Sequence, residues 1–323
     1  MIKTLLSACM ALSVLTAPVV QAADFPQRPI RLLVGFSPGG AVDEMARRLG
    51  QAWETHLGQP VVVENRPGAA SLIAADLAAK AAPDGHTLFL GGTSTLIAAI
   101  LQTQAGQALQ VDPMKDLLAI GAVAESPLAI AVNPGFPAQD IPGFIDAVRA
   151  APGRYFYATS GVGSLHHLGT ELLMQQLGLD MTHVPYKGAS QILPDLINGQ
   201  QIQIGIVSPA STLEQVQSGR IRLVGLLSGP RLEILPDTAS FSETVNGFDD
   251  AISRMIIFAP AQTPAPIVET LNSSLRAALE DPALVRAFAT AGAIPSIRTP
   301  DEVGAQLVRE HAIWERAAAE VMP

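Results

Sequence analysis

The chain has 323 residues, of which 48% are hydrophobic and 15% are charged, a composition that excludes intrinsic disorder, which requires low hydrophobicity and high charge. Its formal net charge of −9 makes nucleic acid an unfavourable partner. The length allows two α/β lobes or a single large one.

The first 23 residues are predicted to be a secretory signal peptide. Lys3 is the only charge ahead of an apolar run at residues 5–20, and small residues lead to a cleavage site near Ala22 or Ala23. Removal of Lys3 leaves 19 basic and 29 acidic residues, a net charge of −10. Beyond residue 23 no apolar run approaches the ~20 residues that a membrane span needs. We therefore expect an exported, periplasmic protein.

Cys9 allows a second interpretation of the same segment. Residues 6–9 match a bacterial lipoprotein box, but the eight residues before Cys9 are too few for a normal charged and apolar region. We favour cleavage near residue 22 and leave lipidation of Cys9 open. Because Cys9 is the only cysteine, the mature chain would have no disulfide, thiol nucleophile or cysteine-based metal site.

Strands and helices alternate through the first hundred residues. A continuous apolar run at 28–36 predicts a buried strand, because strands covered on both faces lack the usual alternation. The following segments are predicted, in order, as a helix at 41–56, a strand at 61–63, a helix at 71–82, a strand at 87–90 and a polar loop at 91–95. This order indicates a parallel sheet with right-handed crossovers.

A second unit begins near residue 122 and has the same alternation. Its predicted segments are strands at 128–132, 155–158, 183–186, 202–207 and 221–227 and helices at 141–150, 164–177 and 191–198. After a proline-rich stretch the chain forms a strand at 255–259 and helices at 266–279, at 282–291 and from 300 onward. We expect this tail to return to the first lobe, partly on the resemblance described below.

Two loops, at residues 36–43 and 158–167, share one design. Each follows a strand, passes through glycines and opens a helix, whose free N–H groups and dipole attract an anion. Both loops would lie beyond the carboxyl ends of their strands, where ligands of open α/β sheets bind. Glycine loops before helices are also common connectors. The pair, with one loop on each lobe, nevertheless favours a shared anion site.

Seven motifs carry a family resemblance, and they occur in family order over nearly the whole mature chain. They are Arg28-Pro-Ile-Arg-Leu32, Ser37-Pro-Gly-Gly-Ala-Val-Asp43, residues 57–68, Ala81-Ala-Pro-Asp-Gly-His-Thr-Leu88, Gly161-Val-Gly-Ser-Leu-His-His-Leu168, His183-Val-Pro-Tyr-Lys-Gly188 and Ala259-Pro-Ala-Gln-Thr-Pro264. With these motifs the chain resembles the binding receptors of the tripartite tricarboxylate transporter system, the Bug family.

The resemblance implies an α/β, two-lobe periplasmic-binding-protein fold (type II, Venus flytrap) with a mostly parallel sheet in each lobe. The expected divisions are a signal peptide at 1–23, lobe 1 at 24–125 and 241–323, and lobe 2 at 126–240. Such a receptor would bind a small carboxylate and deliver it to integral-membrane permease subunits. We expect a monomer with no cofactor, no metal and no catalysis.

The resemblance also assigns ligand contacts to the two loops. The residues concerned are Ser37, Gly39, Gly40, Ser160, Gly161 and Ser164. Asp43 belongs to the same motif but would repel an anion that it faced, so we favour a capping and loop-ordering role for it over direct contact. His167 stands where the family keeps a histidine, and we expect it to pack at the helix start.

The chain departs from the family pattern at two places. Relatives carry an acid followed by serine where this chain has Val207 and Ser208, and Trp-Tyr-Gly where it has Arg254 and the next two residues. If both positions line the cleft, the pocket has lost an acid and gained a cation, and Arg254 could bind a second carboxylate bidentately. Arg254 could equally be a solvated surface residue. The polar loop with Thr93 and Ser94 is a further candidate wall.

Three other functions compete with this one. Ser164 lies near His166 and His167, as the nucleophile of a hydrolase lies near its base, but there is no Gly-x-Ser-x-Gly elbow and no identifiable acid to orient the imidazole. Nucleotide-binding glycine motifs are absent. A ligand-presenting sensor subunit of a membrane kinase would have the same pocket as a transport receptor, so the sequence does not separate the two.

Overall fold

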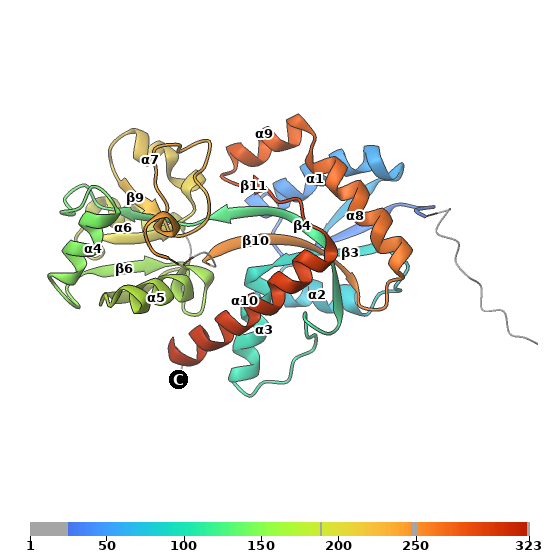
Figure 1. The fold of residues 1–323 in the computed structure, drawn as a ribbon, viewed down its shortest axis with the longest axis horizontal. Coiled ribbons are helices and arrows are strands. Elements are labelled where there is room, and N and C mark those ends of the chain that lie inside the picture. Colours follow the sequence, from blue (N-terminus) through green and yellow to red (C-terminus); the bar gives the residue numbers. More distant parts are fainter. Residues whose placement is uncertain (1–24, 188, 247, 249–250, 322–323) are drawn as a thin grey trace, which may run out of the picture.

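The computed structural model describes residues 25–187, 189–246, 248 and 251–321. The predicted signal peptide, its cleavage site and Cys9 lie outside these residues. The chain folds into two α/β lobes that are joined by two long crossing strands (Figure 1). This arrangement confirms the predicted two-lobe architecture.

The sheet of lobe 1 has six strands in the order β11-β4-β10-β3-β1-β2. Their bounds are β1 (Ile30–Val34), β2 (Val61–Asn65), β3 (Thr87–Gly92), β4 (Leu117–Pro127), β10 (Ile252–Pro260) and β11 (Ile294–Pro295). β1 pairs in parallel with β2 and β3, whereas β10 pairs antiparallel with β3 and β4. The chain thus returns from lobe 2 into the first sheet through β10.

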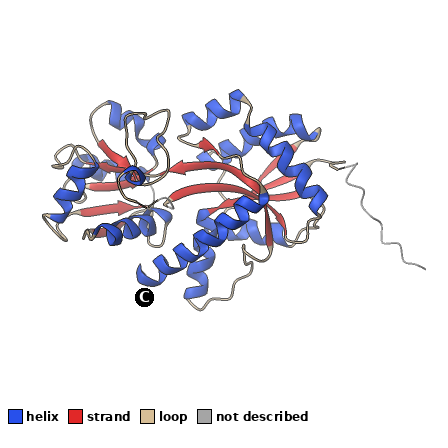
Figure 2. Cartoon of the chain, viewed as in Figure 1, coloured by secondary structure: helices blue, strands red, loops and turns tan. Residues whose placement is uncertain are grey.

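The sheet of lobe 2 has five strands in the order β7-β6-β8-β5-β9. Their bounds are β5 (Ala129–Val132), β6 (Phe156–Thr159), β7 (Thr182–Pro185), β8 (Ile204–Val207) and β9 (Arg222–Leu226). β6 pairs in parallel with β7 and β8, and β5 pairs antiparallel with β8 and β9. Each sheet therefore has a parallel part and an antiparallel part. The antiparallel part of the lobe 1 sheet arises because β4 leaves for lobe 2 and β10 runs back beside it (Figure 2).

Helices cover both sheets. Their bounds are α1 (Ala41–Leu57), α2 (Leu72–Ala79), α3 (Thr93–Gln104), α4 (Ile141–Arg149), α5 (Leu165–Leu177), α6 (Ala189–Asn198), α7 (Leu213–Gln217), α8 (Ala265–Leu279), α9 (Pro282–Thr290) and α10 (Pro300–Val321). The predicted loop at 91–95 is wrong, because β3 ends at Gly92 and α3 begins at the next residue. Gly92 has φ 155°, and a Cβ there would lie 1.8 Å from the Arg254 carbonyl oxygen, so only glycine fits this turn.

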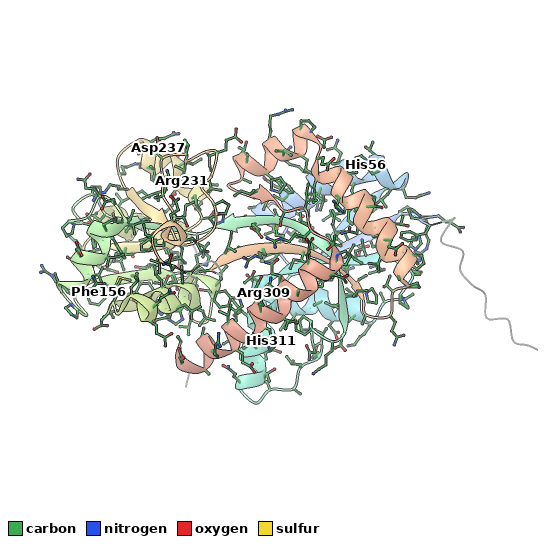
Figure 3. All side chains as sticks on the ribbon, in the orientation of Figure 1. His56, Phe156, Arg231, Asp237, Arg309 and His311 are labelled. Atoms are coloured by element: carbon green, nitrogen blue, oxygen red, sulfur yellow. The ribbon has the colours of Figure 1, made fainter. Side chains whose placement is uncertain are left out.

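Two apolar cores lie on opposite faces of the lobe 1 sheet. One packs α1, α8 and α9 around Trp53, whose indole N–H donates to Ser274 Oγ at 2.8 Å. The other contains Trp314 of α10 and continues through α3 and α5 into lobe 2. α10 therefore contacts both lobes. The side chains fill each lobe, with His56 on lobe 1 and Asp237 on lobe 2 (Figure 3). No described helix is long and apolar enough to cross a membrane.

Candidate functional site

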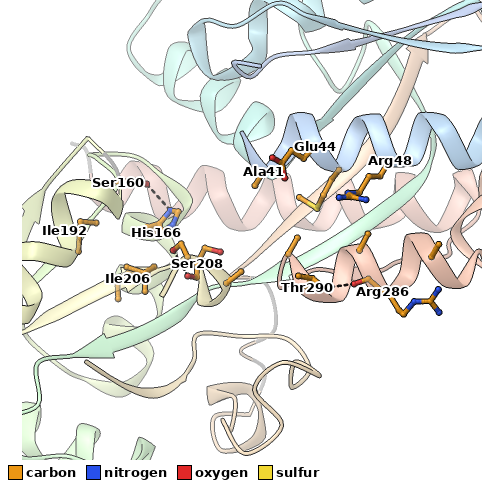
Figure 4. Close-up of a pocket in the computed structure, with 17 residues that line it drawn as sticks. Ala41, Glu44, Arg48, Ser160, His166, Ile192, Ile206, Ser208, Arg286 and Thr290 are labelled. Carbon is orange, nitrogen blue, oxygen red and sulfur yellow. Dashed lines mark hydrogen bonds between the residues drawn. The ribbon is translucent and has the colours of Figure 1, made fainter. Parts of the chain in front are cut away.

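A cleft between the lobes contains two adjoining chambers of about 770 and 630 Å³. We call the larger the α9 chamber, since α9 residues such as Arg286 and Thr290 line it, and the smaller the β10 chamber, since Ser253 and Met255 line it. The residues that line both chambers are Ala41, Met45, Ser160, His166, Ser208 and Ala291. Because Ala41 belongs to α1 and His166 to α5, both lobes contribute to one cleft (Figure 4).

The lobe 1 wall begins at the turn between β1 and α1. Gly39 adopts φ 77°, a left-handed conformation that favours glycine, and its N–H donates to Asp43 Oδ2 at 2.8 Å. The N-cap of α1 is Gly40, which has no capping side chain, so the first-turn N–H groups of Ala41 and Val42 have no side-chain acceptor. Both of these residues line the β10 chamber.

Asp43 holds this turn in place. Its carboxylate also accepts hydrogen bonds from Arg47 at 3.1 Å and Asn65 at 2.8 Å, and the residue is buried. The hydrogen bond from Arg47, helped by those from Gly39 and Asn65, lowers the pKa of Asp43 to about 2. With its oxygens engaged in this way, Asp43 is not among the residues that line either chamber, so it orders the loop and does not face the cleft.

The lobe 2 wall begins at the turn between β6 and α5. Ser164 is the N-cap of α5: its Oγ accepts from the His167 N–H at 3.2 Å and donates to the Gly161 carbonyl at 2.7 Å. This bond leaves the first two N–H groups of the helix, at Leu165 and His166, without a capping acceptor, and both residues line the β10 chamber.

His166 faces both chambers. Its Nδ1 lies 3.0 Å from Ser160 Oγ, and burial lowers its pKa to about 4. The imidazole is therefore neutral near pH 7. The attraction for an anion at this wall comes from backbone N–H groups and the helix dipole rather than from a charged histidine.

A third helix start opens on the same chamber. α3 begins after Gly92, again without a capping side chain, and Ser94 in its first turn lines the β10 chamber. Thr93 is buried instead, and its Oγ1 accepts from the Arg254 backbone N–H at 3.1 Å. Three helix N-termini, those of α1, α3 and α5, thus border one chamber, which is a favourable setting for a negatively charged group.

Eight of the twelve candidate ligand-binding residues fall into two sets. Four of them line the cleft: Ser94, Ser160, Ser164 and Ser208. Ser37, Gly39, Gly40 and Gly161 belong to the two turns beside the cleft but are not among its lining residues, which begin at their neighbours Phe36, Ala41 and Val162.

Arg254 does not lie on the cleft wall. Its Nε is 3.3 Å from Glu125 Oε1. Its Nη1 is 2.9 Å from Glu310 Oε1, an ion-pair contact that does not have the geometry of a hydrogen bond. The side chain is only 11% exposed. Two carboxylates thus already compensate the guanidinium. The placement supports neither alternative, because Arg254 is not a solvated surface residue and does not line the chambers where it could bind a second ligand carboxylate.

His167 faces away from the cleft. Its ring stacks on His183 with centroids 3.8 Å apart, its Nδ1 accepts from the Gly163 N–H at 3.1 Å, and the residue lines a separate groove between α5 and α10. It positions the second loop, in agreement with the packing role expected for it. It is not among the residues that line either chamber.

Sequence reasoning missed several lining residues. His166 was passed over in favour of its neighbour, although successive helical residues point about 100° apart and only one could face the cleft. Three charged residues, Glu44, Arg48 and Arg286, were not predicted as site residues, and all three line the α9 chamber (Figure 4). Arg48 follows Glu44 by one turn on α1, and Arg286 lies on α9. A helical projection of α1 from Ala41 would have found Arg48.

The arrangement offers little to an enzyme. Ser164 Oγ donates to a backbone carbonyl rather than to a histidine, and His166 interacts with Ser160. Within the described chain, no acidic side chain forms a hydrogen bond or ion pair with the His166 ring, whose Nδ1 contacts Ser160 Oγ. Within the same residues, no group of three or more metal-ligating side chains is present.

The comparisons with known proteins agree with this geometry. Residues 45–316 match the family model described as the tripartite tricarboxylate transporter family receptor. The chain belongs to this receptor family. It is 34% identical over 300 residues to protein BugT of Bordetella pertussis, covering 92% of this chain and 90% of that protein. The family and fold are those of substrate-binding receptors rather than enzymes.

Solved structures of similar proteins have the same two-lobe fold. Rpa4515 of R. palustris, solved with adipate, is 30% identical with a TM-score of 0.73 and covers 92% of this chain and 98% of its own. MatC from Rhodopseudomonas palustris, solved with bound malate, is 28% identical with a TM-score of 0.69 and covers 91% of this chain and 99% of its own. These likenesses confirm the resemblance that the sequence motifs indicated.

Proposed function

We propose that this receptor binds a small organic acid between its lobes and delivers it to the permease subunits of a tripartite tricarboxylate-type transporter. The observation that carries the proposal is the convergence of the α1 and α5 starts, one from each lobe, on the β10 chamber. Each start contributes free N–H groups and about +0.5 of a charge from its helix dipole. The relatives solved with adipate and malate support the same ligand class.

The proposed setting is the periplasm, after removal of the signal peptide near Ala22 or Ala23. We take the lobes as residues 24–125 with 241–323, and 126–240. β4 and β10 are the strands that cross between them, so they are the natural hinge for closure. A carboxylate that contacts both helix starts would favour the closed form, which a permease could then recognise. We expect the receptor to act as a monomer.

Thermal unfolding with a panel of acids tests the proposal. The mature chain should show a melting temperature that rises with the concentration of at least one carboxylate, because a ligand bound only to the folded state stabilises it by RT ln(1 + [L]/Kd). The amide of the same acid should have little effect, since it lacks the charge. No carboxylate-dependent shift across the panel would refute the proposal.

Ala41→Pro provides a sharper test of the α1 start. Ala41 is the first helical residue, where proline is tolerated, and Gly40 before it has the extended conformation that a residue before proline needs. The variant removes one N–H donor and should weaken carboxylate binding about tenfold. Ala265→Pro is the matched control, because Ala265 is the first residue of α8 and lines neither chamber. Equal affinity in both variants would exclude the α1 start as an anion site.

A further inference from the structure

The β10 chamber has no full charge on its wall. None of the described residues that line it is Asp, Glu, Lys or Arg, and its titratable group, His166, is neutral at pH 7 because burial lowers its pKa to about 4. The wall is instead formed by apolar side chains and serine hydroxyls. Ser126 of β4 and Ser253 of β10 are directly paired across the crossing strands, and both line the chamber.

Charge balance in this chamber suits a monoanion. The starts of α1 and α5 contribute about +0.5 each, which together match one carboxylate. The start of α3 adds a third partial charge. Arg254 is the nearby full cation, but Glu125 and Glu310 already compensate it, so it is not available to a second carboxylate. A second carboxylate in the chamber would lose its water without gaining a cationic partner, and such desolvation is unfavourable.

The lips of the cleft are apolar. Phe36 on the lobe 1 loop is 37% exposed and Val162 on the lobe 2 loop is 58% exposed, and both line the β10 chamber. A ligand with an apolar body would remove these exposed apolar side chains from water, and this burial makes the free energy of binding more favourable.

On these observations we propose that the receptor selects an acid with a single carboxylate and an uncharged, largely apolar body, and discriminates against di- and tricarboxylates. This rests on the proposed function, because it concerns the ligand class of the same cleft. Arg48 and Arg286 do not alter the expectation: they line the α9 chamber, both are exposed, and Glu44 shares that chamber. Exposed charges contribute little to binding because water screens them.

Affinities for matched pairs of acids test the inference. Titration calorimetry on the mature chain should compare hexanoate with adipate and benzoate with terephthalate, which share a carbon skeleton and differ in one carboxylate. In the pair that binds, the monoacid should bind at least tenfold more tightly, a difference of about 1.4 kcal/mol. A diacid that binds as tightly as its monoacid, or more tightly, overturns the inference.

Two serine variants give the complementary test. Ser253→Arg places a cation in the chamber and should move the preference toward the diacid by at least tenfold, whereas Ser273→Arg on the exposed face of α8 should leave it unchanged. If diacids bind well to the unchanged protein and Arg48→Gln with Arg286→Gln removes that binding, the second carboxylate lies in the α9 chamber and the inference fails while the receptor function stands. If no acid binds at all, the receptor function itself fails.

Discussion

Arg254 should determine stability and not ligand affinity. The guanidinium is nearly buried between β10, β4 and α10, where it meets Glu125 and the 1% exposed Glu310. Arg254→Met keeps an unbranched apolar stem in this space but removes the charge. Glu310 retains Gln306, which donates to its Oε1 at 2.8 Å, and Glu125 retains Arg298 at 3.0 Å, so the carboxylates lose one partner and keep another.

The magnitude follows from this burial. Breaking a buried ion pair by removing one partner costs about 3–5 kcal/mol, and the retained partners place the expected loss of unfolding free energy at about 3 kcal/mol. Adding Glu310→Gln to this variant also removes the buried negative charge. It should restore about 1 kcal/mol or more of the lost unfolding free energy, because the effects of substitutions at contacting residues are not additive. The control is Arg28→Met, which breaks an exposed pair with Asp84 and should cost under about 1 kcal/mol.

Urea unfolding followed by circular dichroism measures these differences, and calorimetry with the tightest acid measures affinity. The affinity of Arg254→Met should stay within about twofold of the unchanged protein under conditions where both are folded. An unfolding free energy lowered by less than about 1 kcal/mol, together with a tenfold loss of affinity for a dicarboxylate, would refute the reasoning and restore Arg254 as a ligand contact.

Three further predictions concern the loops. Asp43→Asn should lower the free energy of unfolding by roughly 2 kcal/mol at pH 7, because the Asp43 pKa of about 2 in the folded chain, against 3.8 when unfolded, stabilises the fold above the unfolded pKa. The loss should shrink as the pH falls from 5 to 2. A pH-independent loss in denaturant titrations would contradict this prediction. Affinity for an acid that is fully ionised should be constant from pH 6 to 8, because the His166 pKa is about 4. An affinity that rises as the pH falls through 6.5 would show that His166 titrates as an ordinary exposed histidine. Ser164→Ala should lower stability by about 1 kcal/mol through loss of the α5 cap, and neither form should hydrolyse ester probes; turnover that disappears in the variant would identify a hydrolase.

The order of strands and helices could be predicted from the sequence because each element carries its own local signal. The exceptions are β4, α7 and β11, where no element was predicted, and α3. Its start reads as a polar loop, since the turn at Gly92 depends on the close approach of the Arg254 carbonyl, which comes from β10 far along the chain. The antiparallel pairing of β10 with β3 and β4 is equally non-local and has no signature in the apolar runs.

The site was predictable only in outline. The two glycine loops identify the region, and Ser160 and Ser164 do line the cleft. The role of Arg254 depended on Glu310, which lies 56 positions later on a helix whose packing the sequence does not reveal. The choice between His166 and His167 depended on where α5 begins, because a shift of one residue turns a helical side chain by about 100°.

The most direct test of the central claim, that one acid is gripped by both lobes, is the distance between spin labels on the two lobes. Cysteines placed by His56→Cys and Asp237→Cys lie on exposed positions of lobe 1 and lobe 2 (Figure 3), and the mature chain is expected to contain no other cysteine. Saturation with the tightest carboxylate should shift the distance distribution and narrow it, and Ala41→Pro should require a higher concentration for the same change. A distribution that does not change at saturation would contradict a ligand held between the lobes.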